Sequence, residues 1–99
     1  MNEVVVKANA LSNDKRLQIL EWLKDPLGNF SPQYPIDENE GVCGLYIAEK
    51  LRVSPATASV HLKILTQAGF LRPLRIGKFT YFKRVETSFA DLARAIESI

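Results

Sequence analysis

The stretch of residues 45–69, LYIAEKLRVSPATASVHLKILTQAG, constrains the fold of this chain more than any other segment. Two short helical patterns meet there at a tight corner. Ser54 is a favourable N-cap, Pro55 suits the first helical position, and Gly69 supplies the left-handed residue that ends a helix. Residues predicted to face inward recur at helical spacing in both halves: Ile47, Ala48 and Leu51, then Ala58, His61, Leu62 and Leu65. The segment therefore predicts a helix-turn-helix, in which the small Ala48 lets the two helices approach closely.

The segment after these two helices has the pattern of a β-hairpin. Phe70–Ile76 and Phe79–Val85 are strand-like, and Gly77 and Lys78 form a short turn between them. A hairpin directly after the second helix is the wing of a winged helix. The sequence therefore predicts a mostly α fold with a small β-hairpin (α+β), a winged helix-turn-helix. With 99 residues, the chain is expected to form one domain over residues 1–99.

Three short patterns in this block occur together: Ile47-Ala48-x-x-Leu51, Ser54-x-x-Thr57-x-Ser59-x-His61-Leu62-Lys63-x-Leu65, and Ala68-Gly69-Phe70-Leu71. They resemble the ArsR/SmtB family of bacterial winged-helix repressors, and the resemblance extends more loosely over Leu11–Leu23 and the C-terminal helix. The family often carries glutamine, which commonly recognises adenine, where this chain has Pro55, so some direct base readout is expected to be absent. At the corner, where a glycine with positive φ is common, this chain has Arg52. Either Arg52 takes that conformation, at a strain of about 1 kcal/mol, or the turn is built differently.

Positive charge is concentrated in the same block, although the net charge of the chain is only +2. Residues 43–84 carry eight basic side chains against one acidic, whereas residues 1–42 carry four against seven and residues 85–99 carry one against three. This distribution favours double-stranded DNA as the partner over a merely solvated charged face, because phosphates would lie on the helix-turn-helix and the wing. The alternative for the same fold is a winged helix used as a protein–protein interaction module.

The candidate DNA contacts come from the second motif helix (residues 55–68) and from the wing (residues 70–85). Serine and threonine hydroxyls exchange hydrogen bonds with base edges or phosphates, small apolar side chains touch a thymine methyl, and lysine meets phosphate. In the helix, which would enter the major groove, the predicted contacts are Pro55, Ala56, Thr57, Ser59, Val60 and Lys63. In the wing, near the adjacent backbone and minor groove, they are Arg72, Arg75 and Lys78.

Two helical segments are expected before the motif. Residues 3–10 are short and apolar, so a helix there needs a neighbour or a second subunit to bury its face. Ser12 is expected to cap a core helix over residues 13–24, whose predicted core positions are Leu17, Ile19, Leu20 and Leu23. Three roles remain open for Arg16: it caps a carbonyl, pairs with an acid, or is a solvated arginine.

The C-terminal segment, residues 87–99, begins with a candidate cap at Thr87 or Ser88 and carries an apolar stripe. In a monomer this stripe would have to fold back on the domain. The family resemblance implies instead that the terminal helices of two subunits pack together, which sets two recognition helices about one DNA turn apart. The predicted interface of this homodimer comprises Val4, Val5, Phe89, Leu92, Ala93 and Ile96.

The segment between the first core helix and the motif, residues 25–42, has three prolines, two glycines and an acidic run. This composition predicts no regular element, and family members typically have a much shorter connection here. Two interpretations compete: an effector or dimer-contact feature, and a tolerated insertion, which the weak dependence of loop-closure entropy on length favours. Phe30, Tyr34 and Ile36 are expected to pin the loop onto the body of the domain.

The resemblance raises the question of metal sensing. One family site is a Cys-x-Cys pair at the start of the first motif helix, but Cys43 is followed by Leu45 in the second place. Another uses aspartate, histidine and glutamate on the C-terminal helices, and this chain has Asp91 and Glu97 but no histidine there. We therefore predict no metal site and no cofactor. A metal- or thiol-responsive sensor using Cys43 is the alternative to a plain buried cysteine, and His61 is expected to have a hydrogen-bonded structural role.

Several classes of protein are not expected. The sequence has no Gly-rich phosphate loop and no nucleophile motif, so we expect no enzyme. No apolar run approaches the roughly 18 residues that a transmembrane helix needs, and the N-terminus lacks the pattern of a secretory signal. A single cysteine excludes an internal disulfide framework and suits a reducing cytoplasm.

Overall fold

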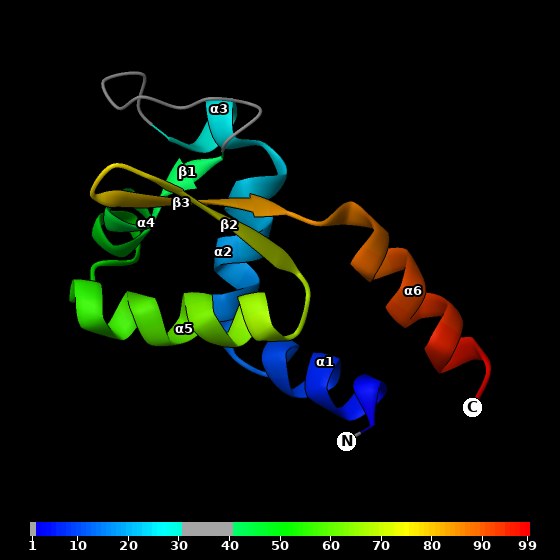
Figure 1. The fold of residues 1–99 in the computed structure, drawn as a ribbon. Helices are drawn as coiled ribbons and strands as arrows, with labels where there is room; N and C mark the ends of the chain where they lie inside the picture. The colour runs from blue at the N-terminus through cyan, green and yellow to red at the C-terminus, as the bar shows by residue number, and fades with distance from the viewer. Residues whose placement is uncertain (1, 31–40) are drawn as a thin grey trace.

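The computed structural model describes residues 2–30 and 41–99, which form a mostly helical domain with a small antiparallel sheet. Its elements are α1 (Glu3–Leu11), α2 (Asp14–Lys24), α3 (Pro26–Asn29), β1 (Val42–Cys43), α4 (Gly44–Leu51), α5 (Pro55–Gln67), β2 (Leu71–Ile76), β3 (Phe79–Arg84) and α6 (Glu86–Glu97). Figure 1 shows α5 running along one side of the domain and α6 leaving β3 towards the end where both termini lie. The predicted winged helix-turn-helix is confirmed. None of the helices in the described part of the chain is long and apolar enough to cross a membrane.

The corner between α4 and α5 contains the positive φ angle that the family pattern suggested. Arg52 lies in the left-handed region (φ 59°, ψ 42°), at a cost of about 1 kcal/mol for a residue with a side chain. The Ser54 Oγ accepts a hydrogen bond of 3.1 Å from the Thr57 N–H, and Pro55 occupies the first helical position. At the other end of α5, Gly69 has a φ of 88°. The local signals in this segment therefore predicted both ends of α5 to within one residue.

The hairpin of β2 and β3 pairs over its whole length, from Leu71 opposite Arg84 to Ile76 opposite Phe79. Gly77 lies in the turn with a φ of 60°, where a residue with a side chain would be strained. The first predicted strand began one residue earlier than β2, at Phe70, and the second ended one residue later than β3, at Val85. The wing is therefore built as the turn signals indicated.

The sheet contains a third strand, β1, which pairs with β3. The sequence did not predict this strand. Val42 of β1 lies opposite Phe82 of β3, and Cys43 lies opposite Tyr81. Gly41, with a φ of 88°, permits the close approach, because a Cβ there would collide with the Phe82 carbonyl. A two-residue strand leaves no recognisable alternation in the sequence, so only its pairing with β3 reveals it.

The prediction that residues 25–42 contain no regular element was wrong at both ends, where α3 and β1 form. The Asp25 carboxylate caps the single turn of α3 by accepting a hydrogen bond of 3.2 Å from a backbone N–H. Phe30 is buried in the core, which confirms it as an anchor of the segment. The other predicted anchors, Tyr34 and Ile36, lie outside the described residues.

The core collects side chains from α2, α4, α5 and the sheet. Its buried members include Ile19, Leu20, Leu23, Ile47, Leu62, Leu65, Phe70 and Leu71. Leu17, also predicted to be in the core, is 44% exposed, so that prediction was wrong. At 3.6 residues per turn Leu17 lies about a third of a turn from the face that the other α2 residues bury. The prediction that Ser12 caps α2 was also wrong. The side chain of Asn13 instead accepts hydrogen bonds from the backbone N–H groups of Lys15 and Arg16.

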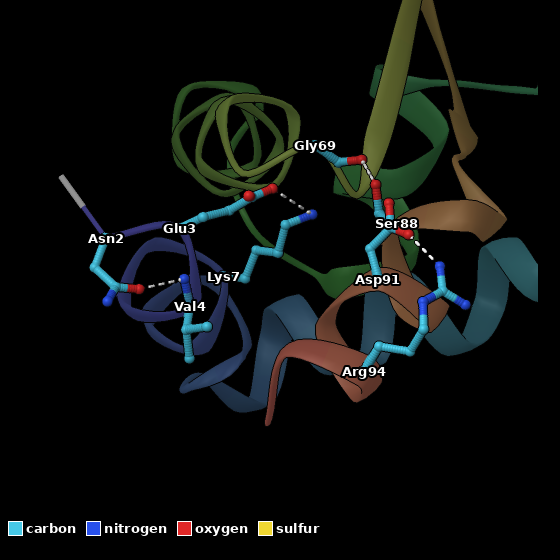
Figure 2. A network of polar contacts seen from close by, with 8 residues as sticks. All are labelled: Asn2, Glu3, Val4, Lys7, Gly69, Ser88, Asp91 and Arg94. Carbon is cyan, nitrogen blue, oxygen red and sulfur yellow. Dashed lines mark hydrogen bonds and ion pairs between the residues drawn. The ribbon is translucent and has the colours of Figure 1, made fainter. Parts of the chain in front are cut away.

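Helix α6 begins at Glu86, and neither Thr87 nor Ser88 caps it. Val85 occupies the N-cap position without a side-chain hydrogen bond. The hydroxyl of Ser88 serves another purpose: it donates a hydrogen bond of 2.6 Å to the carbonyl of Gly69 (Figure 2). Ser88, predicted as a cap, therefore links α6 by a hydrogen bond to the residue that follows the C-terminal end of α5.

Lys7 of α1 reaches the same junction, as Figure 2 shows. The residue is only 5% exposed, and its Nζ lies 3.6 Å from the exposed carboxylate of Glu3. The ammonium also lies 5.2 Å from the centre of the Phe70 ring, at cation–π distance. Both terminal helices are thus attached to the end of α5, next to each other.

Candidate nucleic-acid interface

The N-terminal half of α5 presents an exposed face next to the corner of the motif. Every predicted contact on this helix is exposed: Pro55, Ala56, Thr57, Ser59, Val60 and Lys63. Val60 leaves 58% of its surface in solvent, although it is a large apolar residue. The Ser54 hydroxyl donates a hydrogen bond of 3.0 Å to the Thr57 Oγ1, so the hydrogen of the Thr57 hydroxyl remains available to an outside acceptor. The face thus combines hydroxyls, small apolar groups and one cation.

The wing presents exposed basic side chains beside this helix. Arg72, Arg75 and Lys78 are all exposed, and no acidic residue occurs between Lys50 and Val85. The Arg75 Nε donates a hydrogen bond of 3.0 Å to the Gly77 carbonyl, which holds the side chain over the turn. Because strand residues alternate between faces, Arg72 and Arg75 leave the wing on opposite sides. Only one of these two arginines can therefore face a given groove.

Three large apolar side chains near the wing turn were missed by the sequence reasoning. Leu74, Ile76 and Phe79 are 44%, 39% and 45% exposed. Burial does not alternate along either strand, since every residue of β2 after Leu71 is exposed, so no pattern in the sequence marked these side chains as exposed.

Arg84 does not belong to the exposed basic surface. Its side chain is 11% exposed and donates a hydrogen bond of 2.8 Å to the Leu20 carbonyl. It also forms a two-pronged ion pair with Glu86, at 2.9 Å, and lies 4.1 Å from the centre of the Phe89 ring. Arg84 thus joins β3 to α2 and α6, and the excess of positive charge available to a ligand is smaller than the sequence count suggested.

Lys50 is likewise engaged within the protomer. Its Nζ lies 5.1 Å from the centre of the Trp22 ring and 5.5 Å from that of Phe30. The two rings meet edge to face with their centres 6.2 Å apart. Lys50 therefore covers the joint between α2, α3 and α4.

Arg16 caps the C-terminal end of α1, which decides between the three roles that the sequence left open. Its Nε donates a hydrogen bond of 2.7 Å to the Ala10 carbonyl, and its Nη2 donates one of 3.1 Å to the Asn9 carbonyl. Its Nη1 lies 3.2 Å from the Nδ1 of His61, which accepts a hydrogen bond from Arg16 in the tautomer whose Nδ1 carries no proton. Burial lowers the pKa of His61 below its usual 6.5, and the charges of Arg16 and Lys15 lower it further. The hydrogen-bonded role predicted for His61 is confirmed.

Cys43 is a free cysteine that is only 3% exposed, as the plain buried alternative predicted. It occupies the N-cap position of α4. On the C-terminal helix, Asp91 is paired with Arg94 at 2.6 Å. Within residues 2–30 and 41–99, no three His, Cys, Asp or Glu side chains come together in a group that could hold a metal ion.

The predicted dimer residues divide into two groups in the protomer. Val5 and Ile96 are 49% and 52% exposed, and Ala93 is exposed with them. Val4 and Phe89 are half-buried, and Leu92 is only 8% exposed within the core of its own protomer. The C-terminal stripe thus does fold back on the domain in part, because α6 packs against α1, and Leu92 has little surface left for a partner.

Comparison with known proteins identifies relatives of this chain. Residues 41–72, from the residue before β1 to the second residue of β2, match the family described as "Bacterial regulatory protein, arsR family". An uncharacterised HTH-type transcriptional regulator of Bacillus subtilis (strain 168), YbzH, is 51% identical over 85 residues, which cover 85% of each chain.

Solved structures show the same arrangement of helices and wing. An ArsR-like transcriptional regulator from Rhodococcus sp. RHA1 superposes with a TM-score of 0.70 at 21% identity, covering 97% of this chain and 77% of that one. The homodimeric winged helix-turn-helix DNA-binding domain (fragment 1–100) of a possible ArsR-family transcriptional regulator from Mycobacterium bovis superposes with a TM-score of 0.67 at 25% identity, with the same coverage.

Proposed function

The chain belongs to the ArsR family of bacterial transcriptional regulators, and we propose that it acts as a homodimeric repressor that binds a specific operator through α5 and the wing. The winged helix-turn-helix is a DNA-binding fold, and the related domain from Mycobacterium bovis is described as homodimeric. Residues 1–99 act as one domain in this proposal. The protein works in the cytoplasm, where the operator lies.

One observation carries the proposal: the exposed face of α5 has hydroxyls and small apolar groups and lies in a stretch without acidic residues. The hydroxyls of Thr57 and Ser59 exchange hydrogen bonds with base edges in the major groove, and Ala56 and Val60 contact thymine methyls. Lys63, one turn further along, meets a phosphate.

The wing contributes the remaining contacts. Lys78 at its tip and one of Arg72 and Arg75 bind the adjacent backbone or minor groove, and the other arginine stays in solvent because it leaves the opposite face. Phosphate contacts of this kind set the affinity and its salt dependence without selecting a sequence.

The dimer uses the exposed apolar residues of the terminal helices, chiefly Val5, Ala93 and Ile96, with Val4 and Phe89 at the edge. A two-fold axis there places two copies of α5 in successive major grooves about one helical turn apart. The operator is therefore an inverted repeat.

Selection of binding sites from random double-stranded DNA tests this function. We expect enrichment of an inverted repeat with half-sites about 10 base pairs apart, bound by a dimer in sedimentation analysis. Fluorescence anisotropy with the selected site and with a scrambled site measures the preference, which is typically about 10³-fold or more. Equal affinity for both sites, or enrichment of an unpaired half-site, contradicts the proposal.

A further inference from the structure

A cavity of about 270 Å³ lies where α4, the start of α5 and the wing come together. Figure 1 shows these three parts meeting at one end of the domain, away from the chain termini. The walls of the cavity are largely apolar and include Leu45 of α4, Leu62 of α5, and Phe79 and Phe82 of β3. An apolar cavity of about 150 Å³ is enough to bind benzene, so this one has room for a single ring with a small substituent.

Among residues 2–30 and 41–99, the charge that lines the cavity has one sign. Lys78, at the wing turn, is the one charged side chain among the described residues that line it. The hydroxyl-bearing residues Ser59 and Thr80 are the other polar side chains in the lining, apart from the Cys43 thiol. An apolar wall with a single exposed cation complements a molecule that is apolar at one end and anionic at the other.

We propose that this cavity binds a small aromatic carboxylate and that binding releases DNA. The ring lies against Leu45, Leu62 and Phe79, and the carboxylate pairs with the ammonium of Lys78. Release follows from the position of the cavity, because Pro55, Ser59 and Lys78 line it and are also the contacts proposed for DNA. A carboxylate on Lys78 and a DNA phosphate compete for the same cation, so the regulatory part of this inference rests on the proposed function.

Binding to the free protein tests the cavity without any DNA. Benzoate is titrated into the protein while the methyl signals of the leucines are followed by NMR. We expect the signals of Leu45 and Leu62 to shift and saturate with a Kd of about 0.1–1 mM, typical of a ligand of this size. The signals of Leu27 and Leu92, outside the lining, stay in place. Benzamide, an uncharged molecule of the same shape, binds at least about tenfold more weakly because it lacks the ion pair.

Two variants locate the site. Leu45→Trp fills the cavity from a position that is 47% exposed, and it should abolish the benzoate shift of Leu62, whereas Leu27→Trp, the same change at an exposed leucine elsewhere, should not. Lys78→Ala should bind benzoate and benzamide alike. Absence of saturable shifts, equal binding of the two ligands by the parent, or unchanged binding by Leu45→Trp overturns the proposal.

The regulatory part is tested by fluorescence anisotropy on the selected operator, with ionic strength held constant by sodium chloride. At ten times its own Kd, benzoate should raise the apparent Kd for DNA about tenfold in the parent and leave it unchanged in Leu45→Trp. Saturation of the cavity without loss of DNA affinity overturns the regulatory part. Failure of the parent to bind any operator counts against the proposed function, and the titration of the free protein still decides whether the cavity binds a carboxylate.

Discussion

The exposed face of α5 and the two terminal helices differ in how many contacts their side chains make within the protomer. On α5, Val60 and Lys63 are exposed, and neither belongs to the hydrophobic core or packs against it. On α1 and α6, the side chains hold the domain together: Leu92 is in the core, Ser88 bonds the end of α5, and Lys7 lies over Phe70.

This difference separates two kinds of mutational effect. A substitution on the α5 face is expected to remove a proposed DNA contact and to leave folding nearly unchanged, because surface changes of this kind usually alter the free energy of unfolding by less than about 0.5 kcal/mol. A substitution on a terminal helix alters packing, and through packing the placement of any dimer contact. The same helices are exposed at Val5 and Ile96, so the two effects can be separated within one helix.

The largest effect is expected for Leu92→Ala. Removing a buried leucine side chain leaves a cavity and should lower the free energy of unfolding by about 2–4 kcal/mol. Val60→Ala, an apolar truncation on the exposed face of α5, is the matched control and should change it by less than about 0.5 kcal/mol. Urea unfolding followed by circular dichroism, at one protein concentration for all variants, measures both values. Similar losses in the free energy of unfolding for the two variants would contradict the contrast between α5 and the terminal helices.

Ile96→Asp should separate dimerisation from folding. Ile96 is 52% exposed in the protomer, so the charge is harmless in the monomer but costly in an apolar dimer seam. We expect monomers in sedimentation velocity and a loss of operator affinity of about 10²-fold, because the second half-site no longer adds to the first. The control is Leu27→Asp, at a leucine that is 58% exposed on α3, a helix far from the termini in Figure 1, and this variant should stay dimeric. A dimer that survives Ile96→Asp places the interface elsewhere.

A smaller effect is expected for Lys63→Ala. The loss of one phosphate contact should reduce the slope of log Kd against log salt concentration by about one unit and weaken binding to all sequences alike. Lys24→Ala removes the same charge from the end of α2 and should leave the slope unchanged. Anisotropy titrations at several salt concentrations provide the slopes. An altered sequence preference with an unchanged slope would assign Lys63 to base readout.

The smallest effect concerns pH and the contact between Arg16 and His61. Because the pKa of His61 in the folded protein is lowered from 6.5, the unfolded chain takes up the proton more readily. Stability should therefore fall as the pH drops below about 6.5 through the folded-state pKa, and be fully retained above 6.5. His61→Gln removes this contribution, so the parent should lose more stability than the variant between pH 7 and pH 5 in thermal unfolding. An identical pH dependence of the two proteins would show that His61 does not titrate differently on folding.

The sequence alone determined the helix-turn-helix and the wing, with the bounds of α5 and of both wing strands correct to within one residue. Ser54, Pro55, Gly69 and Gly77 act through backbone geometry within a few residues, and such local rules hold wherever the segment packs. The excess of positive charge over residues 43–84 was read directly from the residue types, and the exposure of the candidate contacts on α5 followed from helical periodicity. The resemblance to the ArsR family rested on the residue patterns within this segment, and the comparisons with known proteins confirmed it.

The tertiary structure alone decided which side chains serve the fold and which are left for a partner. Arg84 was counted with the basic surface and Leu92 with the dimer seam, and each has a different place because of its distant neighbours. The same holds for β1, which forms only because β3 lies beside it, and for Ser88, whose hydroxyl bonds a carbonyl 19 residues away. Burial and hydrogen bonding depend on contacts between residues far apart in sequence, and no pattern within one helix or strand specifies them.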